Sequence, residues 1–236
     1  MSRRNTLLLV AAFIGLLAIL YPRSNQRHEE PKQYPGRNNT VLFLSNGDSA
    51  LGNALLATTY SLLVDHTDLE VHYGTFKKFE KPIQNINKWA ASRSSSAGTA
   101  QFHRFKSLDY FEALHEKNVT FADVTGPPGL PGFEIFRGNF PHYLMPWDGP
   151  EYLSLYNEVV ALIEEIDPAV VVADVLFSPG IDAVRALGRR EAIISPNGVK
   201  DNFADHQPWL AVLWKYPLYV PSLSSKCISD TTRSTA

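Results

Sequence analysis

One nine-residue run, AVVVADVLF at positions 169–177, constrains the fold more than any other stretch of this chain. All of its residues are apolar except Asp174. A strand without polar alternation is typical of a parallel sheet whose two faces are both covered by helices. The segments on either side, 151–168 and 178–190, have helical spacing. Strands that alternate with helices in this way indicate βαβ units and a parallel sheet.

The first half of the chain repeats the alternation. A β-branched and apolar run at 40–45 predicts a strand, and the spacing of the leucines predicts a helix over 51–65. We therefore expect an α/β fold, a Rossmann-like parallel sheet flanked by helices, in one domain at 39–220. The remaining predicted elements are strands at 69–76, 102–105 and 191–197 and a helix at 78–91.

The N-terminus differs from the rest of the chain. After Arg3 and Arg4, residues 7–21 carry no charge. Fifteen helical residues rise about 22 Å, less than the ~30 Å hydrocarbon core, so the run could be an uncleaved signal anchor, a cleaved signal or a buried helix. We favour the anchor, because the small residues of a cleavage site are missing from the sequence that follows.

These features predict three segments outside the domain at 39–220, and a location. Residues 1–22 are expected to be a single-pass membrane segment, most simply in the endoplasmic reticulum, and residues 23–38 a linker. Residues 221–236, which are rich in Ser and Thr, are expected to be a disordered tail. Basic residues lie on both sides of the apolar run, so the side of the membrane stays open.

Composition excludes several classes of function. A net charge of -2 leaves no footprint for nucleic acid. Cys227 is the only cysteine and the histidines show no metal spacing, so neither a disulfide nor a metal site is predicted. Gly47 and Gly52 follow the first strand, but their spacing matches neither a dinucleotide fingerprint nor a P-loop. No cofactor is expected.

A segment rich in proline and glycine spans residues 124–150, with six prolines and five glycines. This density argues against any long regular element. The segment also carries several aromatic side chains, among them Phe136, Phe140 and Trp147. It is either a loop packed over the core or an apolar wall for a small-molecule site.

Asp174 lies near the end of its predicted strand, where doubly wound sheets place their ligand crevice. A carboxylate in so apolar a strand needs a hydrogen-bond partner, because its burial is otherwise costly. It could cap the following helix, or it could belong to an active site.

Two segments, EEIDPAVVVADVLFSPGIDAVRALGRREAIISPN and KDNFADHQPWLAVLWKYP, together with the first strand–loop–helix, resemble the N-terminal half of family-1 UDP-glycosyltransferases of the fungal type. The resemblance covers residues 40–220. It implies the GT-B fold, in which two Rossmann-like halves face each other across a cleft. The N-terminal half binds the acceptor and the C-terminal half binds the UDP-sugar.

The resemblance also implies catalytic roles. In this family a histidine after the first strand deprotonates the acceptor hydroxyl, and an aspartate orients that histidine during inverting transfer. Asp174 falls at the position of the aspartate. The glycine–histidine position reads Gly52-Asn53, and an asparagine amide cannot accept the proton. His206 is the alternative candidate for the base.

No part of the sequence resembles the donor-binding half. We therefore expect the acceptor-binding half of a membrane-anchored UDP-glycosyltransferase, inactive alone, with a UDP-sugar bound only if a donor domain is supplied. The expected acceptor is small and apolar, with Phe136, Phe140 and Trp147 forming its wall. The alternative is a non-catalytic, membrane-tethered binding or scaffold subunit that recruits a separate donor-binding partner.

Overall fold

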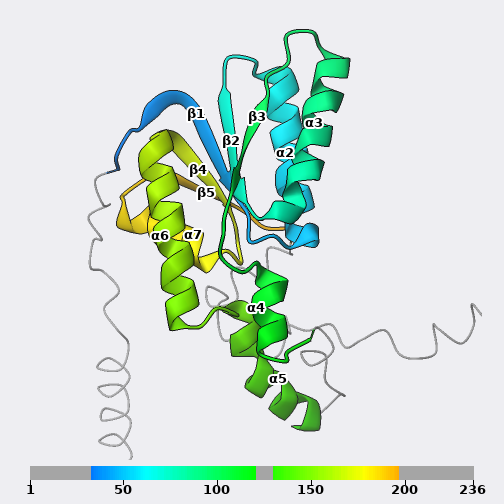
Figure 1. Cartoon of the computed structure of the whole chain (residues 1–236), viewed down its shortest axis with the longest axis vertical. Helices are drawn as coiled ribbons and strands as arrows, with labels where there is room; N and C mark the ends of the chain where they lie inside the picture. The colour runs from blue at the N-terminus through cyan, green and yellow to red at the C-terminus, as the bar shows by residue number, and fades with distance from the viewer. Residues whose placement is uncertain (1–32, 121–129, 197–236) are drawn as a thin grey trace, which may run out of the picture. The chain divides into compact units, whose positions relative to one another are not determined.

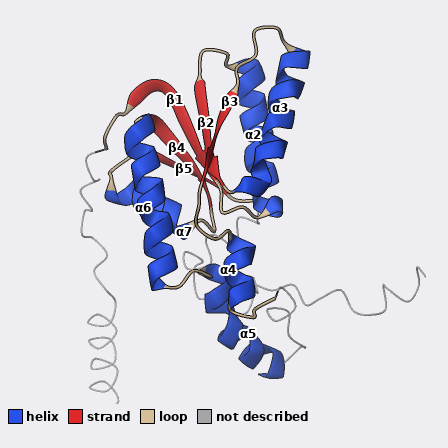
Figure 2. Ribbon diagram, in the orientation of Figure 1, coloured by secondary structure: helices blue, strands red, loops and turns tan. Residues whose placement is uncertain are grey.

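The computed structural model describes residues 33–120 and 130–196, and it contains a five-stranded parallel sheet in the order β3-β2-β1-β4-β5 (Figures 1 and 2). The fold class predicted from the sequence, an α/β parallel sheet flanked by helices, is confirmed. The strands are β1 (Arg37–Leu44), β2 (Glu70–Thr75), β3 (Ala100–Arg104), β4 (Pro168–Asp174) and β5 (Glu191–Ile194). The helices are α2 (Ser49–Asp65), η1 (Lys77–Phe79), α3 (Glu80–Arg93), α4 (Tyr110–Glu116), α5 (Leu130–Leu144), α6 (Gly149–Ile166) and α7 (Ser178–Ala186).

The central strand β1 divides the core into two layers. Its side chains alternate, so that Val41 and Phe43 pack with α2 and α3, while Leu42 and Leu44 pack with α6 and α7. Figure 2 shows the two helix pairs on opposite faces of the sheet. Because both faces are covered at the centre of the sheet, β4 is apolar up to Asp174, as the run at 169–177 predicted.

The segment at 124–150 contains a regular element that the sequence analysis did not expect. Helix α5 has 15 residues, so the prediction that proline density prevents a long element was wrong. Pro131 lies in the first turn, where a backbone N–H has no partner within the helix, whereas Pro141 stands inside the helix, three residues before its end. Pro150 likewise stands in the first turn of α6.

Helix α4 was also missed, although the sequence carries a signal for it. Asp109 accepts hydrogen bonds from the backbone N–H groups of Phe111 and Glu112, and the Glu112 side chain accepts from the Asp109 N–H in return. This reciprocal arrangement is a capping box. Its signature, an acidic residue followed three positions later by a glutamate, is visible in the amino-acid sequence itself.

The fold begins before residue 39. The backbone N–H of Tyr34 donates to the carbonyl of Gly188, and β1 starts at Arg37, inside the segment predicted to be a linker. The predicted membrane segment 1–22, the predicted tail 221–236 and His206 all lie outside the described residues. Among the residues that the structure does describe, no helix combines the length and apolar character needed to cross a membrane.

Candidate functional site

Asp174 is the last residue of β4 and is fully buried at the carboxyl end of the sheet. Its carboxylate accepts hydrogen bonds from the backbone N–H of Asn46, at 2.8 Å, and of Leu176, at 2.9 Å. The N-cap residue of α7 is Phe177, and no side chain accepts a hydrogen bond at this helix start. Asp174 therefore does not cap the following helix. It ties the loop after β1 to the turn after β4.

The protonation of Asp174 is unusual for an aspartate. Burial raises the pKa of its carboxyl to about 7, while the hydrogen bonds from the Asn46 and Leu176 backbone act in the opposite direction. The group therefore exchanges a proton near neutral pH. Such perturbed carboxyl groups at a ligand-binding edge are common in functional sites.

The loop after β1, residues 45–48, is held from several sides. The hydroxyl of Thr75 donates to the carbonyl of Ser45, and the backbone N–H of Tyr110 donates to the carbonyl of Asn46. The Asn46 side-chain oxygen accepts from the Asp48 N–H at 2.7 Å. These bonds connect the loop to β2 and α4, so its conformation is fixed where β1, β2 and β4 end.

Two buried polar groups beside this loop have no hydrogen-bond partner within the described part of the chain. They are the amide nitrogen of Asn46 and the hydroxyl of Tyr73. Buried polar atoms are nearly always satisfied, so these two groups are exceptions in the interior next to Asp174. Sequence reasoning missed Asn46. The turn-forming string Asn46-Gly47-Asp48 directly after a strand is the signal that points to it.

Asn53 does not lie at this site. The sheet-facing side of α2 carries Leu51, Gly52 and Leu55, and Asn53 is exposed on the opposite side. There it lines a groove of about 550 Å³ between α2 and α3, together with Tyr60 and Trp89 among others. No hydrogen bond joins Asn53 to Asp174 in the described structure. The structure therefore does not bring together the two residues that the sequence analysis paired.

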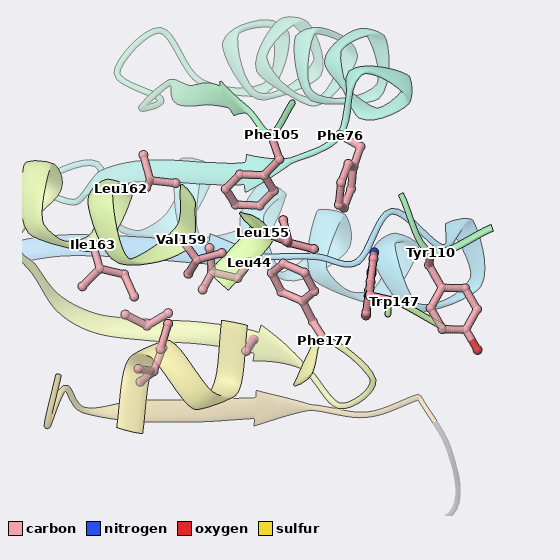
Figure 3. Close-up of a cluster of buried hydrophobic side chains, with 14 of the residues drawn as sticks. Leu44, Phe76, Phe105, Tyr110, Trp147, Leu155, Val159, Leu162, Ile163 and Phe177 are labelled. Atoms are coloured by element: carbon pink, nitrogen blue, oxygen red, sulfur yellow. The ribbon is translucent and has the colours of Figure 1, made fainter. Parts of the chain in front are cut away.

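The three aromatic residues predicted to bind the acceptor differ in their surroundings. Trp147 is buried in the core, with its ring centroid 6.1 Å from those of both Tyr110 and Phe177 (Figure 3). Its indole N–H donates to the carbonyl of Leu108 at 3.0 Å. Phe140 is half-buried on α5. Phe136 belongs to the same helix, but its side chain lies outside the described part of the structure.

The chemistry at this edge of the sheet is that of hydrogen-bonding and protonatable groups. Within residues 33–120 and 130–196, no cluster of three or more His, Cys, Asp or Glu side chains is arranged to hold a metal ion. The site consists of a buried carboxyl group, backbone N–H groups and amide and hydroxyl groups. These can position a polar ligand and exchange a proton.

Comparison with known proteins supports the family suggested by the sequence. The chain is 29% identical over 186 residues to the glycosyltransferase SdnJ of the fungus Sordaria araneosa. The resemblance to a fungal glycosyltransferase is confirmed. The match covers 76% of this chain but only 36% of the relative, so the chain spans little more than a third of that protein. No model of a known protein family matches the chain.

Three solved glycosyltransferases align with part of the chain. They are SsfS6 of Streptomyces sp. SF2575 (18% identity, 65% of this chain and 38% of that one, TM-score 0.41), UGT73P12 of Glycyrrhiza uralensis (16%, 75% and 31%, 0.42) and the spinosyn rhamnosyltransferase SpnG (15%, 78% and 43%, 0.37). The second was solved with glycyrrhetinic acid 3-O-monoglucuronide and the third with thymidine diphosphate. At TM-scores this low, the alignments establish neither a shared fold nor a shared site.

Proposed function

We propose that this chain is the acceptor-binding half of a UDP-glycosyltransferase with the GT-B fold. The observation that carries the proposal is the similarity to a fungal glycosyltransferase over most of the chain. The parallel sheet, with a buried carboxyl group at its carboxyl edge, is compatible with that role. In the complete protein a donor-binding half would hold the UDP-sugar, and transfer to a small apolar acceptor would proceed with inversion.

Asp174 is a positioning residue in this proposal. Its carboxylate holds the Asn46 backbone, and through it the loop that borders the acceptor side of the site. The general base would come from outside the described residues, where His206 is the first candidate. Phe136 and Phe140 of α5 would form the acceptor wall, and Trp147 would support that wall from the core.

The proposal is tested by completing the protein. A hybrid that joins residues 1–220 to the donor-binding half of a related fungal UDP-glycosyltransferase is expected to transfer glucose from UDP-glucose to an apolar alcohol or phenol. The chain alone is expected to give no transfer above the background rate. A folded hybrid that binds UDP-glucose but transfers no sugar to any member of an acceptor panel would contradict the proposal.

A non-catalytic subunit is the second candidate. It is favoured by one observation: no histidine in the described part of the chain hydrogen-bonds Asp174, whose carboxylate partners are backbone N–H groups. Such a subunit would sit in a membrane and recruit a separate donor-binding protein. Co-purification of a donor-binding partner with the tagged chain, and transfer activity only in that complex, would support this candidate over a single-chain enzyme.

A further inference from the structure

A groove lies at the carboxyl edge of the sheet, where β2 and β3 end. A groove of about 520 Å³ is lined by residues 76–78, 104–109 and 112, and we call it the β2–β3 groove. It is formed by the segments that directly follow β2, which ends at Thr75, and by the end of β3 at Arg104. Carboxyl ends of parallel strands are where open α/β sheets bind ligands. The groove does not include Asp174 or Asn46.

Positive charge dominates the lining of the β2–β3 groove. Lys78 is paired with Asp109 at 3.0 Å, and the Glu112 carboxylate accepts the Asp109 backbone N–H at 2.8 Å. The other three cationic residues, Lys77, Arg104 and Lys106, form no ion pair or side-chain hydrogen bond with any described residue. All three are exposed to solvent at the groove. The lining therefore carries four cationic and two anionic side chains, and this net positive charge favours a bound anion.

The groove has a firm base. The buried rings of Phe76 and Phe105 meet edge to face, with centroids 5.6 Å apart, and both residues line it (Figure 3). The loop that carries Lys106 is held by Glu158, which accepts from the Lys106 N–H at 2.6 Å and from the Ser107 hydroxyl at 2.6 Å. No ion pair joins Glu158 to the Lys106 ammonium in the described part of the chain.

We propose that the β2–β3 groove binds a small molecule that combines a carboxylate or phosphate group with an apolar body. Lys77, Arg104 and Lys106 recognise the anionic group through charge-assisted hydrogen bonds. The apolar body packs near Phe76, Phe105 and Leu108. The volume is that of a site for a small organic ligand. This binding is independent of sugar transfer, because it requires neither a donor domain nor a catalytic base.

The experiment compares one aromatic body with and without charge. Calorimetry on the full chain uses 1-naphthoate, 1-naphthyl phosphate and the neutral 1-naphthamide. The variant Lys77→Gln/Arg104→Gln/Lys106→Gln is expected to bind the preferred anion at least about tenfold more weakly, with the amide unaffected. The control, Lys81→Gln/Lys88→Gln/Arg93→Gln, removes the same charge from exposed positions of α3. This control variant is expected to bind the preferred anion with an affinity within about twofold of the wild type.

The two anionic probes separate a carboxylate ligand from a phosphate ligand. Equal losses in both triple variants, or equal affinity of the wild-type chain for anion and amide, would overturn the proposal. Binding of anionic phospholipid vesicles without binding of either small anion would also overturn it, in favour of a membrane surface. If the groove variant does not fold, the single variant Lys106→Gln is compared with the wild-type chain in its place. Raising NaCl from about 50 mM to about 500 mM must then weaken anion binding but not amide binding.

Discussion

At the scale of single residues, Asp174 combines burial with partners that favour its charge. The backbone N–H groups of Asn46 and Leu176 stabilise the carboxylate, whereas the surrounding core disfavours it. Burial dominates, and the carboxyl pKa rises to about 7. The protonated and charged forms therefore have comparable free energies near neutral pH. A small change nearby, such as a bound ligand, can decide which form is present.

Asp174 makes the stability of the protein depend on pH. Its folded-state pKa lies above the ordinary value of 3.8, so the folded chain binds a proton that the unfolded chain has lost between these values. The resulting stabilisation is complete below about pH 4 and is lost as the pH rises through 7. Between about pH 5 and about pH 8 the wild type should lose roughly 2–3 kcal/mol relative to Asp174→Asn.

Urea unfolding of both proteins at the two pH values measures this difference. The comparison with Asp174→Asn removes the contributions of all other titrating groups, which the two proteins share. Parallel stability curves for wild type and variant would show that Asp174 has the same pKa in the folded and unfolded chain.

The position of Asn53 gives a second prediction at this scale. Its side chain faces the groove between α2 and α3, away from the loop that Asp174 holds. In the hybrid enzyme, Asn53→His should therefore leave the transfer rate within about twofold, although a well-placed general base contributes 10²–10⁴-fold. His206→Ala, the matched comparison, should reduce the rate by a factor in that range. A gain of about 100-fold from Asn53→His would place residue 53 in the active site.

At the scale of elements, helix α2 approaches η1 so closely that only a glycine fits at position 52. A Cβ atom there would lie 2.3 Å from the Phe79 ring. Gly52 is thus a packing residue of the α2–α3 layer, and it lies on the sheet-facing side of α2, which turns its neighbour Asn53 outward. The close packing of Gly52 against Phe79 therefore accounts for the glycine of the Gly52-Asn53 pair without a catalytic role.

A matched pair of glycine substitutions tests this packing. Gly52→Ala should destabilise the protein by about 1–3 kcal/mol, because the methyl group overlaps the Phe79 ring. Gly138→Ala, in α5, meets no atom within 4 Å and should stabilise by up to about 1 kcal/mol through helix propensity. Thermal or urea unfolding gives both values. A stabilising Gly52→Ala would show that α2 and Phe79 can separate at no cost.

The sequence predicts these elements unequally, for physical reasons. The apolar run that became β4 was recognisable because a strand covered on both faces has no polar alternation. Helix α5 was not recognisable in the sequence, because the effect of a proline on a helix depends on its position within that helix. Asp174 was found as a buried carboxylate. Its hydrogen-bond partners could not be predicted from the sequence. Asn46 lies 128 positions away and donates through its backbone N–H, a group that nearly every residue has.

At the scale of the whole molecule, the apolar run at 7–21 gives a prediction about location. We expect the chain to remain in the membrane pellet after carbonate extraction, because an uncharged, apolar run of this length favours hydrocarbon over water. Deletion of residues 7–21 is the control and should move the chain to the soluble fraction. A soluble product of the wild-type gene that begins after Tyr21 would show that the run is a cleaved signal.

The membrane fraction from this experiment can also show on which side of the membrane the domain lies. Asn38 and Asn118 each begin an Asn-x-Thr sequence and are exposed. If the domain is lumenal, treatment with an N-glycosidase should lower its apparent mass, and the double variant Asn38→Gln/Asn118→Gln should not respond. An unchanged mass for the wild type would contradict a glycosylated lumenal domain.

The order of the strands has a consequence for synthesis on the ribosome. Strand β1 is made first, yet one of its two neighbours, β4, emerges about 130 residues later, as the pairing of Leu42 with Val171 illustrates. Until then Leu42 and Leu44 lack the helices that cover them, and an edge of β1 is open to other chains. The nascent chain therefore carries an exposed apolar edge for most of its translation, and chaperones that recognise such edges should bind it during that interval.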